Sequence, residues 1–128
     1  MKKLIFLLLL LSTFLIGTSA VDNTQIYLAR AIASKMGDEP FVVRVHYGEM
    51  LLNRVENDEF PDALSDVCAD LGINIYRTKP SGSDLRAAAA ALSGMDFSGG
   101  ALNVKKINKK SAPPESSSGV RLYDWYFY

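Results

Sequence analysis

The first 20 residues fix how much of the chain remains to fold. Lys2 and Lys3 precede an apolar run over residues 4–16, and small residues follow up to Ala20. This order is typical of a secretory signal peptide that is cleaved after Ala20. The alternative, a membrane anchor, needs roughly 20 apolar residues, and the run is shorter. We therefore expect a secreted or cell-envelope protein with one small domain over residues 21–128 and no membrane span after cleavage.

The charge of the chain argues against a nucleic-acid partner. The sequence holds 14 basic and 14 acidic residues, and removal of Lys2 and Lys3 gives the exported domain a small net negative charge. One local basic cluster could face an anionic polymer such as a cell wall, or it could be a solvated loop. Its members are Lys105, Lys106, Lys109 and Lys110.

The rare reactive side chains indicate no metal site and no cofactor. Cys68 is the only cysteine, so no intrachain disulfide can form, and we expect it to be a small buried residue. His46 is the only histidine and has no partner at metal-ligand spacing. We assign it no catalytic role.

Apolar periodicity and capping residues predict four helices. Three of them cover residues 23–37, 39–55 and 60–72, with Gly37 and Gly72 as stop signals. The fourth is rich in alanine and runs from Asp84 to about Ser93, with Ser83 as its N-cap.

Strands are predicted mainly at the C-terminus. Residues 73–77 are β-branched and apolar enough to be extended. Residues 101–104 follow a Gly-Gly turn and should pair with a strand over residues 120–128, about half of whose aromatic side chains should be buried. A surface loop over residues 105–119 should connect them. The expected fold is α+β, with four helices and a short antiparallel C-terminal sheet.

Five short segments, read in order, resemble the SleB/CwlJ family of cell-wall hydrolases. They are Leu28-Ala29-Arg30-Ala31-Ile32, Gly37-Asp38-Glu39-Pro40, Leu52-Asn53-Arg54-Val55, Phe60-Pro61 and Gly99-Gly100-Ala101-Leu102. The resemblance covers nearly all of residues 21–128. It implies a lysozyme-like domain that cleaves the glycan strands of peptidoglycan as a lytic transglycosylase.

The resemblance also implies that the catalytic acid is missing. Such cleavage needs one carboxylic acid to protonate the glycosidic oxygen, while the 6-hydroxyl of the substrate supplies the nucleophile. Ungapped alignment with the family puts Lys35 at the position of this glutamate. An ammonium group holds its proton too tightly at neutral pH to serve as the acid. We therefore expect impaired catalysis.

Two further departures from the family fall in the region expected to bind sugar. Asn103 stands where relatives continue into an aromatic-rich strand, and Trp125 stands near a position that is often histidine. Together with Tyr126, these residues are the candidates for substrate binding, because planar apolar faces suit sugar CH groups.

Two glutamates are candidates for a substitute acid. Glu39 matches the second glutamate of the family pattern, but a residue at the start of a helix is also favoured by the helix dipole. Glu49 falls on an otherwise apolar helix, where relatives carry a small residue. Because a buried carboxylate is costly unless paired, we expect Glu49 to form an ion pair with Lys35 or Arg44.

Three functions are compatible with these residues. The first is a peptidoglycan hydrolase-like protein with impaired cleavage, and the second is a non-catalytic domain that binds the wall or a partner. The third is an active hydrolase that uses Glu39 or Glu49.

Overall fold

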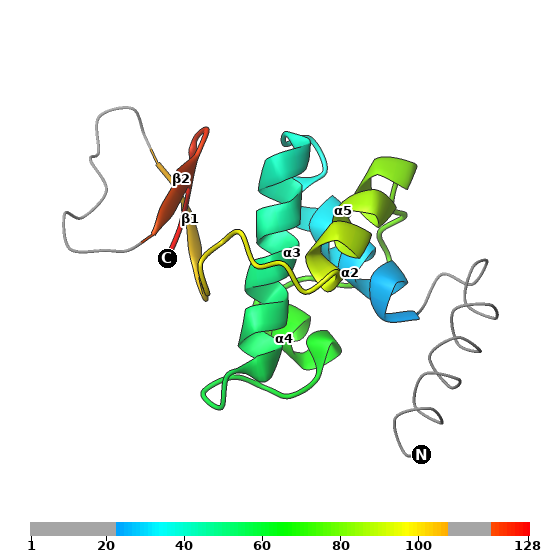
Figure 1. The fold of residues 1–128 in the computed structure, drawn as a ribbon. Coiled ribbons are helices and arrows are strands. Elements are labelled where there is room, and N and C mark those ends of the chain that lie inside the picture. The colour runs from blue at the N-terminus through cyan, green and yellow to red at the C-terminus, as the bar shows by residue number, and fades with distance from the viewer. Residues whose placement is uncertain (1–22, 108–118) are drawn as a thin grey trace, which may run out of the picture.

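Four helices precede three short strands in the computed structural model, which describes residues 23–107 and 119–128. The elements are α2 (Asn23–Met36), α3 (Phe41–Glu56), α4 (Leu64–Asp70), α5 (Gly82–Leu92), β1 (Val104–Lys106), β2 (Val120–Leu122) and β3 (Trp125–Phe127). The strands form a small antiparallel sheet at the C-terminal end (Figure 1). The predicted α+β class is therefore confirmed.

Helix α3 is the central element of the fold. It packs against α2, α4 and α5, and also contacts β3. Figure 1 shows it between the terminal sheet on one side and the α2–α5 pair on the other. A Cβ atom at Gly48 would lie 3.0 Å from Ala91 Cβ and 3.1 Å from Ile32 Cδ1. The glycine thus lets α2 and α5 approach α3 closely.

The C-terminal segment differs from the single strand predicted for it. It forms the hairpin β2–β3, because Tyr123 adopts a positive φ of 53° and reverses the chain. The sheet order is β1-β3-β2, and Val104 and Val120 both lie opposite Phe127. The fully buried Phe127 ring lies 5.5 Å from the His46 ring and so joins the sheet to α3. Of residues 125–128, two are buried, which agrees with the prediction for the aromatic side chains.

The strand predicted over residues 101–104 begins later, at Val104, and continues to Lys106. The residues before it still pair with the end of the chain. The amides of Leu102 and Asn103 donate to the Tyr128 carbonyl oxygen at 3.0 and 2.8 Å, respectively. The predicted partnership between these two segments is therefore confirmed, with the strand itself displaced along the chain.

Three other local predictions were wrong. Helix α4 begins at Leu64 rather than at residue 60. Residues 73–77 form no strand, and residues 75–77 form a turn. Ile73 and Ile75 insert into the helical core, and no described strand lies beside them to pair with. The N-cap of α5 is Ser81 rather than Ser83.

The lone thiol lies inside the helical core. Cys68 is buried as expected, and burial raises the pKa of its thiol to about 11, so the thiol stays protonated. None of the helices within residues 23–107 and 119–128 is long and apolar enough to cross a membrane. The predicted signal peptide and most of the loop predicted over residues 105–119 lie outside the described residues.

Candidate functional site

Two of the predicted site residues, Lys35 and Glu39, lie at the junction of α2 and α3. Lys35 is in the last turn of α2, and its side chain is exposed. It makes no hydrogen bond or ion pair with any residue that the structure describes. Glu39 is half-buried in the turn before α3, and its backbone amide donates to the Met36 carbonyl oxygen at 3.0 Å.

Glu49 lies apart from this junction, in a cavity between α3 and α5. Its side chain is 2% exposed, and Oε2 accepts a hydrogen bond from the Ser98 amide at 2.8 Å. The cavity has a volume of about 330 Å³ and is also lined by Asp96. Among the described residues, the only ion pair joins Arg44 to Asp84. The predicted pairing of Glu49 with Lys35 or Arg44 was therefore wrong: the Ser98 backbone amide is its partner.

Burial raises the pKa of Glu49 above its ordinary value. The amides of Phe97 and Ser98 oppose this rise, as does His46, whereas the Asp96 carboxylate adds to it. Oε1 has no hydrogen-bond partner among the described residues, so the ionised form is incompletely compensated. Protonation of Glu49 is thus favoured in the folded state relative to the unfolded chain.

Glu49→Gln should raise the free energy of unfolding at pH 8 by about 1 kcal/mol, because the neutral amide can still accept the Ser98 hydrogen bond without burying a charge. The effect has a defined pH dependence. Because the pKa of Glu49 is higher in the folded protein than in the unfolded chain, protonation stabilises the folded wild type at pH values below the unfolded pKa near 4.5. This stabilisation is lost as the pH rises through the pKa of the folded protein. Urea unfolding of both proteins at pH 4, 6 and 8 should show that the difference in their free energies of unfolding widens as the pH rises. A difference that stayed constant would contradict a raised pKa of Glu49 in the folded protein.

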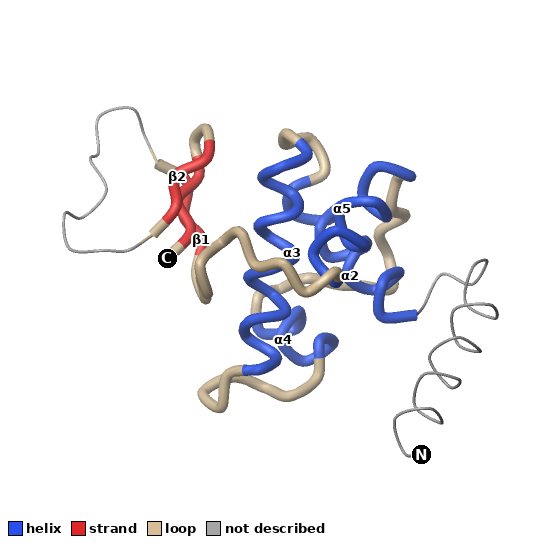
Figure 2. Tube along the Cα trace, viewed as in Figure 1, coloured by secondary structure: helices blue, strands red, loops and turns tan. Residues whose placement is uncertain are grey.

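Asn53 organises the loop that connects α5 to β1. This loop crosses α3 on its way to the sheet (Figure 2). The Asn53 side-chain amide donates to Asp96 Oδ2 at 3.1 Å, to Ala101 O at 3.0 Å and to Ser98 Oγ at 3.3 Å. Asp96 in turn accepts from the backbone amides of Ser98 and Gly100. Burial favours the neutral acid, but these hydrogen bonds outweigh it and lower the pKa of Asp96.

Asn53→Ala is expected to lower the free energy of unfolding by about 2–3 kcal/mol, because it removes one donor from the Asp96 carboxylate and leaves the Ala101 carbonyl oxygen without its side-chain donor. Asn74→Ala is the matched control, since Asn74 is exposed and its side chain accepts a hydrogen bond from the nearby Tyr76 amide. The control should cost less than about 1 kcal/mol. Chemical denaturation measures both values, and equal losses would argue against a special role for Asn53.

Arg54, the residue after Asn53, binds the loop between α5 and β1 at a point nearer to β1. Its Nε donates to the Leu102 carbonyl oxygen at 2.6 Å, and an Nη donates to Asn103 Oδ1 at 3.2 Å. Its guanidinium also lies 4.7 Å from the centre of the Phe60 ring. Asn103, a predicted sugar-binding residue, therefore has its side-chain oxygen engaged by Arg54. Its side-chain nitrogen makes no hydrogen bond with a residue that the structure describes.

The other two predicted sugar-binding residues lie with Asn103 on the terminal sheet. Tyr126 is buried and stacks on Tyr128, with ring centres 5.6 Å apart and planes inclined by 18°. Lys105 Nζ lies within 6 Å of both rings. Trp125 is half-buried and its ring lies 5.8 Å from Lys106 Nζ. The sheet thus carries a group of aromatic faces, with Tyr128 46% exposed.

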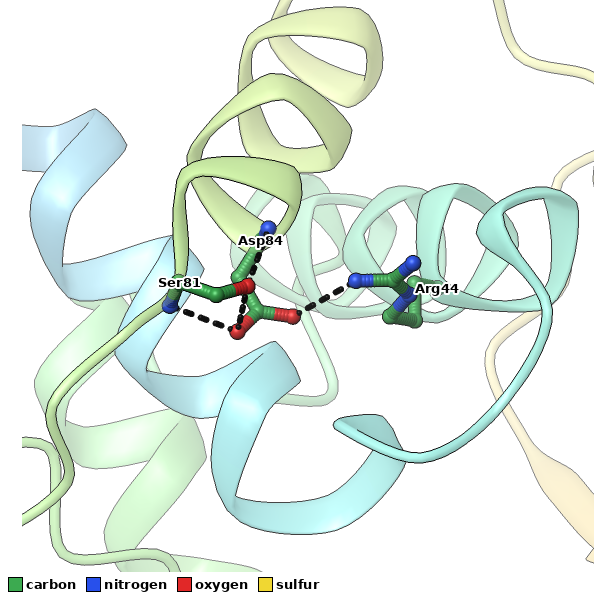
Figure 3. Close-up of polar contacts among 3 residues, drawn as sticks. All are labelled: Arg44, Ser81 and Asp84. Atoms are coloured by element: carbon green, nitrogen blue, oxygen red, sulfur yellow. Dashed lines mark hydrogen bonds and ion pairs between the residues drawn. The ribbon is translucent and has the colours of Figure 1, made fainter.

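A buried ion pair joins the beginnings of α3 and α5. Arg44 Nη1 lies 3.0 Å from Asp84 Oδ1, and the other carboxylate oxygen accepts from the Ser81 amide and hydroxyl (Figure 3). Burial alone would raise the pKa of Asp84, but the Ser81 and Arg44 hydrogen bonds lower it below its ordinary value. Asp84 therefore both caps α5 and fixes it to α3.

Sequence reasoning missed the residues that organise these two networks. The capping box Ser81-x-x-Asp84 carries a recognisable signal, a serine three residues before a side chain that can return the hydrogen bond. The contact of Glu49 with the Ser98 amide carries no such signal, because its partner is a backbone group 49 residues away.

The arrangement of four helices and a terminal three-stranded sheet is shared with two solved catalytic domains. The catalytic domain of the Bacillus cereus SleB protein aligns with a TM-score of 0.64 and 23% identity, over 85% of this chain and 92% of that one. The catalytic domain of germination-specific lytic transglycosylase SleB from Bacillus anthracis aligns with a TM-score of 0.63 and 22% identity, over 85% and 97%. No protein-family model and no curated protein matches the sequence. The resemblance inferred from sequence is thus confirmed at the level of the fold.

Proposed function

We propose that the protein is an exported, SleB-type wall protein that binds the glycan strands of peptidoglycan and cleaves them weakly or not at all. The shared fold supports a domain of lytic transglycosylase ancestry. The apolar N-terminal segment supports export to the compartment that holds the wall. The exposed Tyr128 ring on the terminal sheet supports sugar binding, because it offers a flat apolar surface.

The expected loss of activity rests on the sequence resemblance, which puts Lys35, an exposed lysine, at the position of the family's acid. In the transglycosylase reaction the bond between C1 and the bridging oxygen breaks, and that oxygen takes a proton from the acid. The 6-hydroxyl then bonds to C1 and returns its proton to the carboxylate. An ammonium group releases its proton too reluctantly for the first step, and its charge repels a developing oxocarbenium ion.

The substitute acids receive little support from their surroundings. Glu49 is 2% exposed, and one of its oxygens accepts a hydrogen bond from the Ser98 amide, so the glycosidic oxygen between two bulky sugar rings cannot reach it without rearrangement. Glu39 precedes α3, where its charge complements the helix N-terminus. We therefore favour the non-lytic function over an active enzyme.

Binding and cleavage can be tested separately on purified sacculi. The protein should sediment with sacculi, and the suspension should not clear at neutral pH. Tyr128→Ala should weaken sedimentation by about threefold to tenfold, because it removes a ring that can stack on sugar. Tyr123→Ala is the matched control, since Tyr123 is 64% exposed but lies at the hairpin turn. Clearing at a rate typical of lytic enzymes, or absence of sedimentation, would overturn the proposal.

A further inference from the structure

The cavity that contains Glu49 lies where α3 and α5 end. One wall is apolar, formed by Leu52, Leu92 and Met95. Glu49 and Asp96 line the same cavity, and so does Glu56, the last residue of α3. The cavity is therefore amphipathic, with an apolar wall beside a group of carboxylates.

The ionisable side chains that line this cavity are all acidic. None of the residues that line it is a lysine or an arginine. Helices α3 and α5 both end beside it, at Glu56 and Leu92, and a helix C-terminus carries a partial negative charge. Arg44 and Arg54 are engaged elsewhere, by Asp84 and by the loop before β1. The negative charge of the cavity is thus not balanced by the arginines of α3.

Among the described residues, a single buried carboxylate oxygen in this cavity lacks a hydrogen-bond partner. Asp96 accepts hydrogen bonds on both of its oxygens. Glu49, in contrast, uses only Oε2, and its buried Oε1 has no hydrogen-bond partner in the described residues. Buried carboxylate oxygens are normally satisfied, so this one indicates a missing donor.

We propose that the cavity binds a primary ammonium group carried on an aliphatic stem. The ammonium would complement the Glu49 carboxylate, and the stem would cover the wall formed by Leu52, Leu92 and Met95. A primary ammonium offers three donors on a compact charge and suits a single free acceptor better than a planar guanidinium, which prefers a carboxylate with two free oxygens.

A metal ion fits this cavity less well than an organic cation. Across residues 23–107 and 119–128, no group of three or more His, Cys, Asp and Glu side chains could hold a metal ion. The apolar wall would also offer no ligands to a hydrated ion. This site does not depend on the proposed glycan-binding function, because it lies between α3 and α5 and not on the terminal sheet.

The charge requirement can be measured by NMR titration of the ¹⁵N-labelled protein. n-Pentylammonium should produce saturable shifts of the Gly94, Asp96 and Ser98 amides with a Kd in the millimolar range. 1-Pentanol has the same stem without the charge and should bind at least about tenfold more weakly. Equal binding of the two would overturn the proposal, since the cavity would then be an apolar site only.

Variants provide a second, independent test. Glu49→Gln should weaken binding of n-pentylammonium at least about tenfold, and its own spectrum reports whether it is folded. Glu59→Gln removes an exposed carboxylate outside the cavity and should leave the Kd unchanged. Wild-type affinity of the Glu49→Gln variant would also overturn the proposal.

The natural source of the ammonium can be identified with two further probes. L-Ala-γ-D-Glu-L-Lys carries the side-chain amine found in a wall stem peptide, and cadaverine is a free diamine. Tighter binding of the tripeptide, lost on acetylation of its side-chain amine, would assign the site to the wall. Tighter binding of cadaverine would assign it to free polyamines. Binding of the acetylated tripeptide as tightly as the free one would contradict an ammonium site.

Discussion

Asp84→Ala is expected to lower the free energy of unfolding by about 3–5 kcal/mol, the largest stability effect that we predict. The substitution leaves the Arg44 guanidinium, whose side chain is 12% exposed, without a counter-ion. The Arg44 Nε atom already lacks a hydrogen-bond partner among the described residues, so local rearrangement offers little compensation. The same change removes half of the capping box at Ser81. Chemical denaturation at neutral pH measures the loss.

Two controls separate the buried pair from a general effect of charge. Asp66→Ala removes an exposed acid from the first turn of α4 and should cost less than about 1 kcal/mol. The double variant Arg44→Met/Asp84→Leu should recover much of the lost stability, because hydrophobic replacement of a buried pair is often nearly neutral. A double variant as unstable as the sum of its single changes would argue against a direct interaction.

The pair should also confer a pH dependence. The pKa of Asp84 is lower in the folded protein than in the unfolded chain, so its contribution is present above the unfolded value near 4. This stabilisation is lost as the pH falls through the lower pKa that Asp84 has in the folded protein. The stability difference between the wild type and Asp84→Asn should therefore shrink as the pH falls below about 4. A difference that grew on acidification would contradict the assignment.

The helices could be predicted from sequence because each carries a local signal. Helix α3 has buried residues over most of its length and ends in a polar segment at residues 56–59. The start of α5 is less clear, because Ser81 and Ser83 are both good caps. The structure selects Ser81, because only that position places Asp84 where its side chain can return the hydrogen bond.

The strands and the Glu49 site depend on contacts that the sequence does not reveal. Residues 73–77 have strand composition, but no neighbouring strand is available to them, so β propensity alone gave a wrong prediction. A buried glutamate on α3 correctly indicates a need for a partner. Its partner is the Ser98 amide, and a backbone donor supplied by a distant loop leaves no trace in the pattern of charges.

The position of Lys35 gives the most direct test of function. Lys35→Glu is expected to raise glycan cleavage by about 10²–10⁴-fold over the wild type, the usual contribution of a general acid. The new side chain would stand in the last turn of α2, where the wild-type side chain is exposed and makes no hydrogen bond or ion pair with a described residue. The substitution should therefore cost little stability. Mass spectrometry of soluble fragments released from sacculi measures the gain.

Three comparisons give this gain a specific meaning. Lys35→Gln removes the cation without supplying an acid, so it should stay at the wild-type rate. Lys79→Glu makes the same change of charge at an exposed position that is not a candidate site residue. Its rate of fragment release should also equal that of the wild type. Sedimentation with sacculi shows whether Lys35→Glu still binds its polymer. A variant that binds sacculi as well as the wild type but releases no more fragments than Lys35→Gln would show that residue 35 does not face the scissile bond. Release by Lys35→Glu alone would instead show that one proton donor separates this domain from an active lytic transglycosylase.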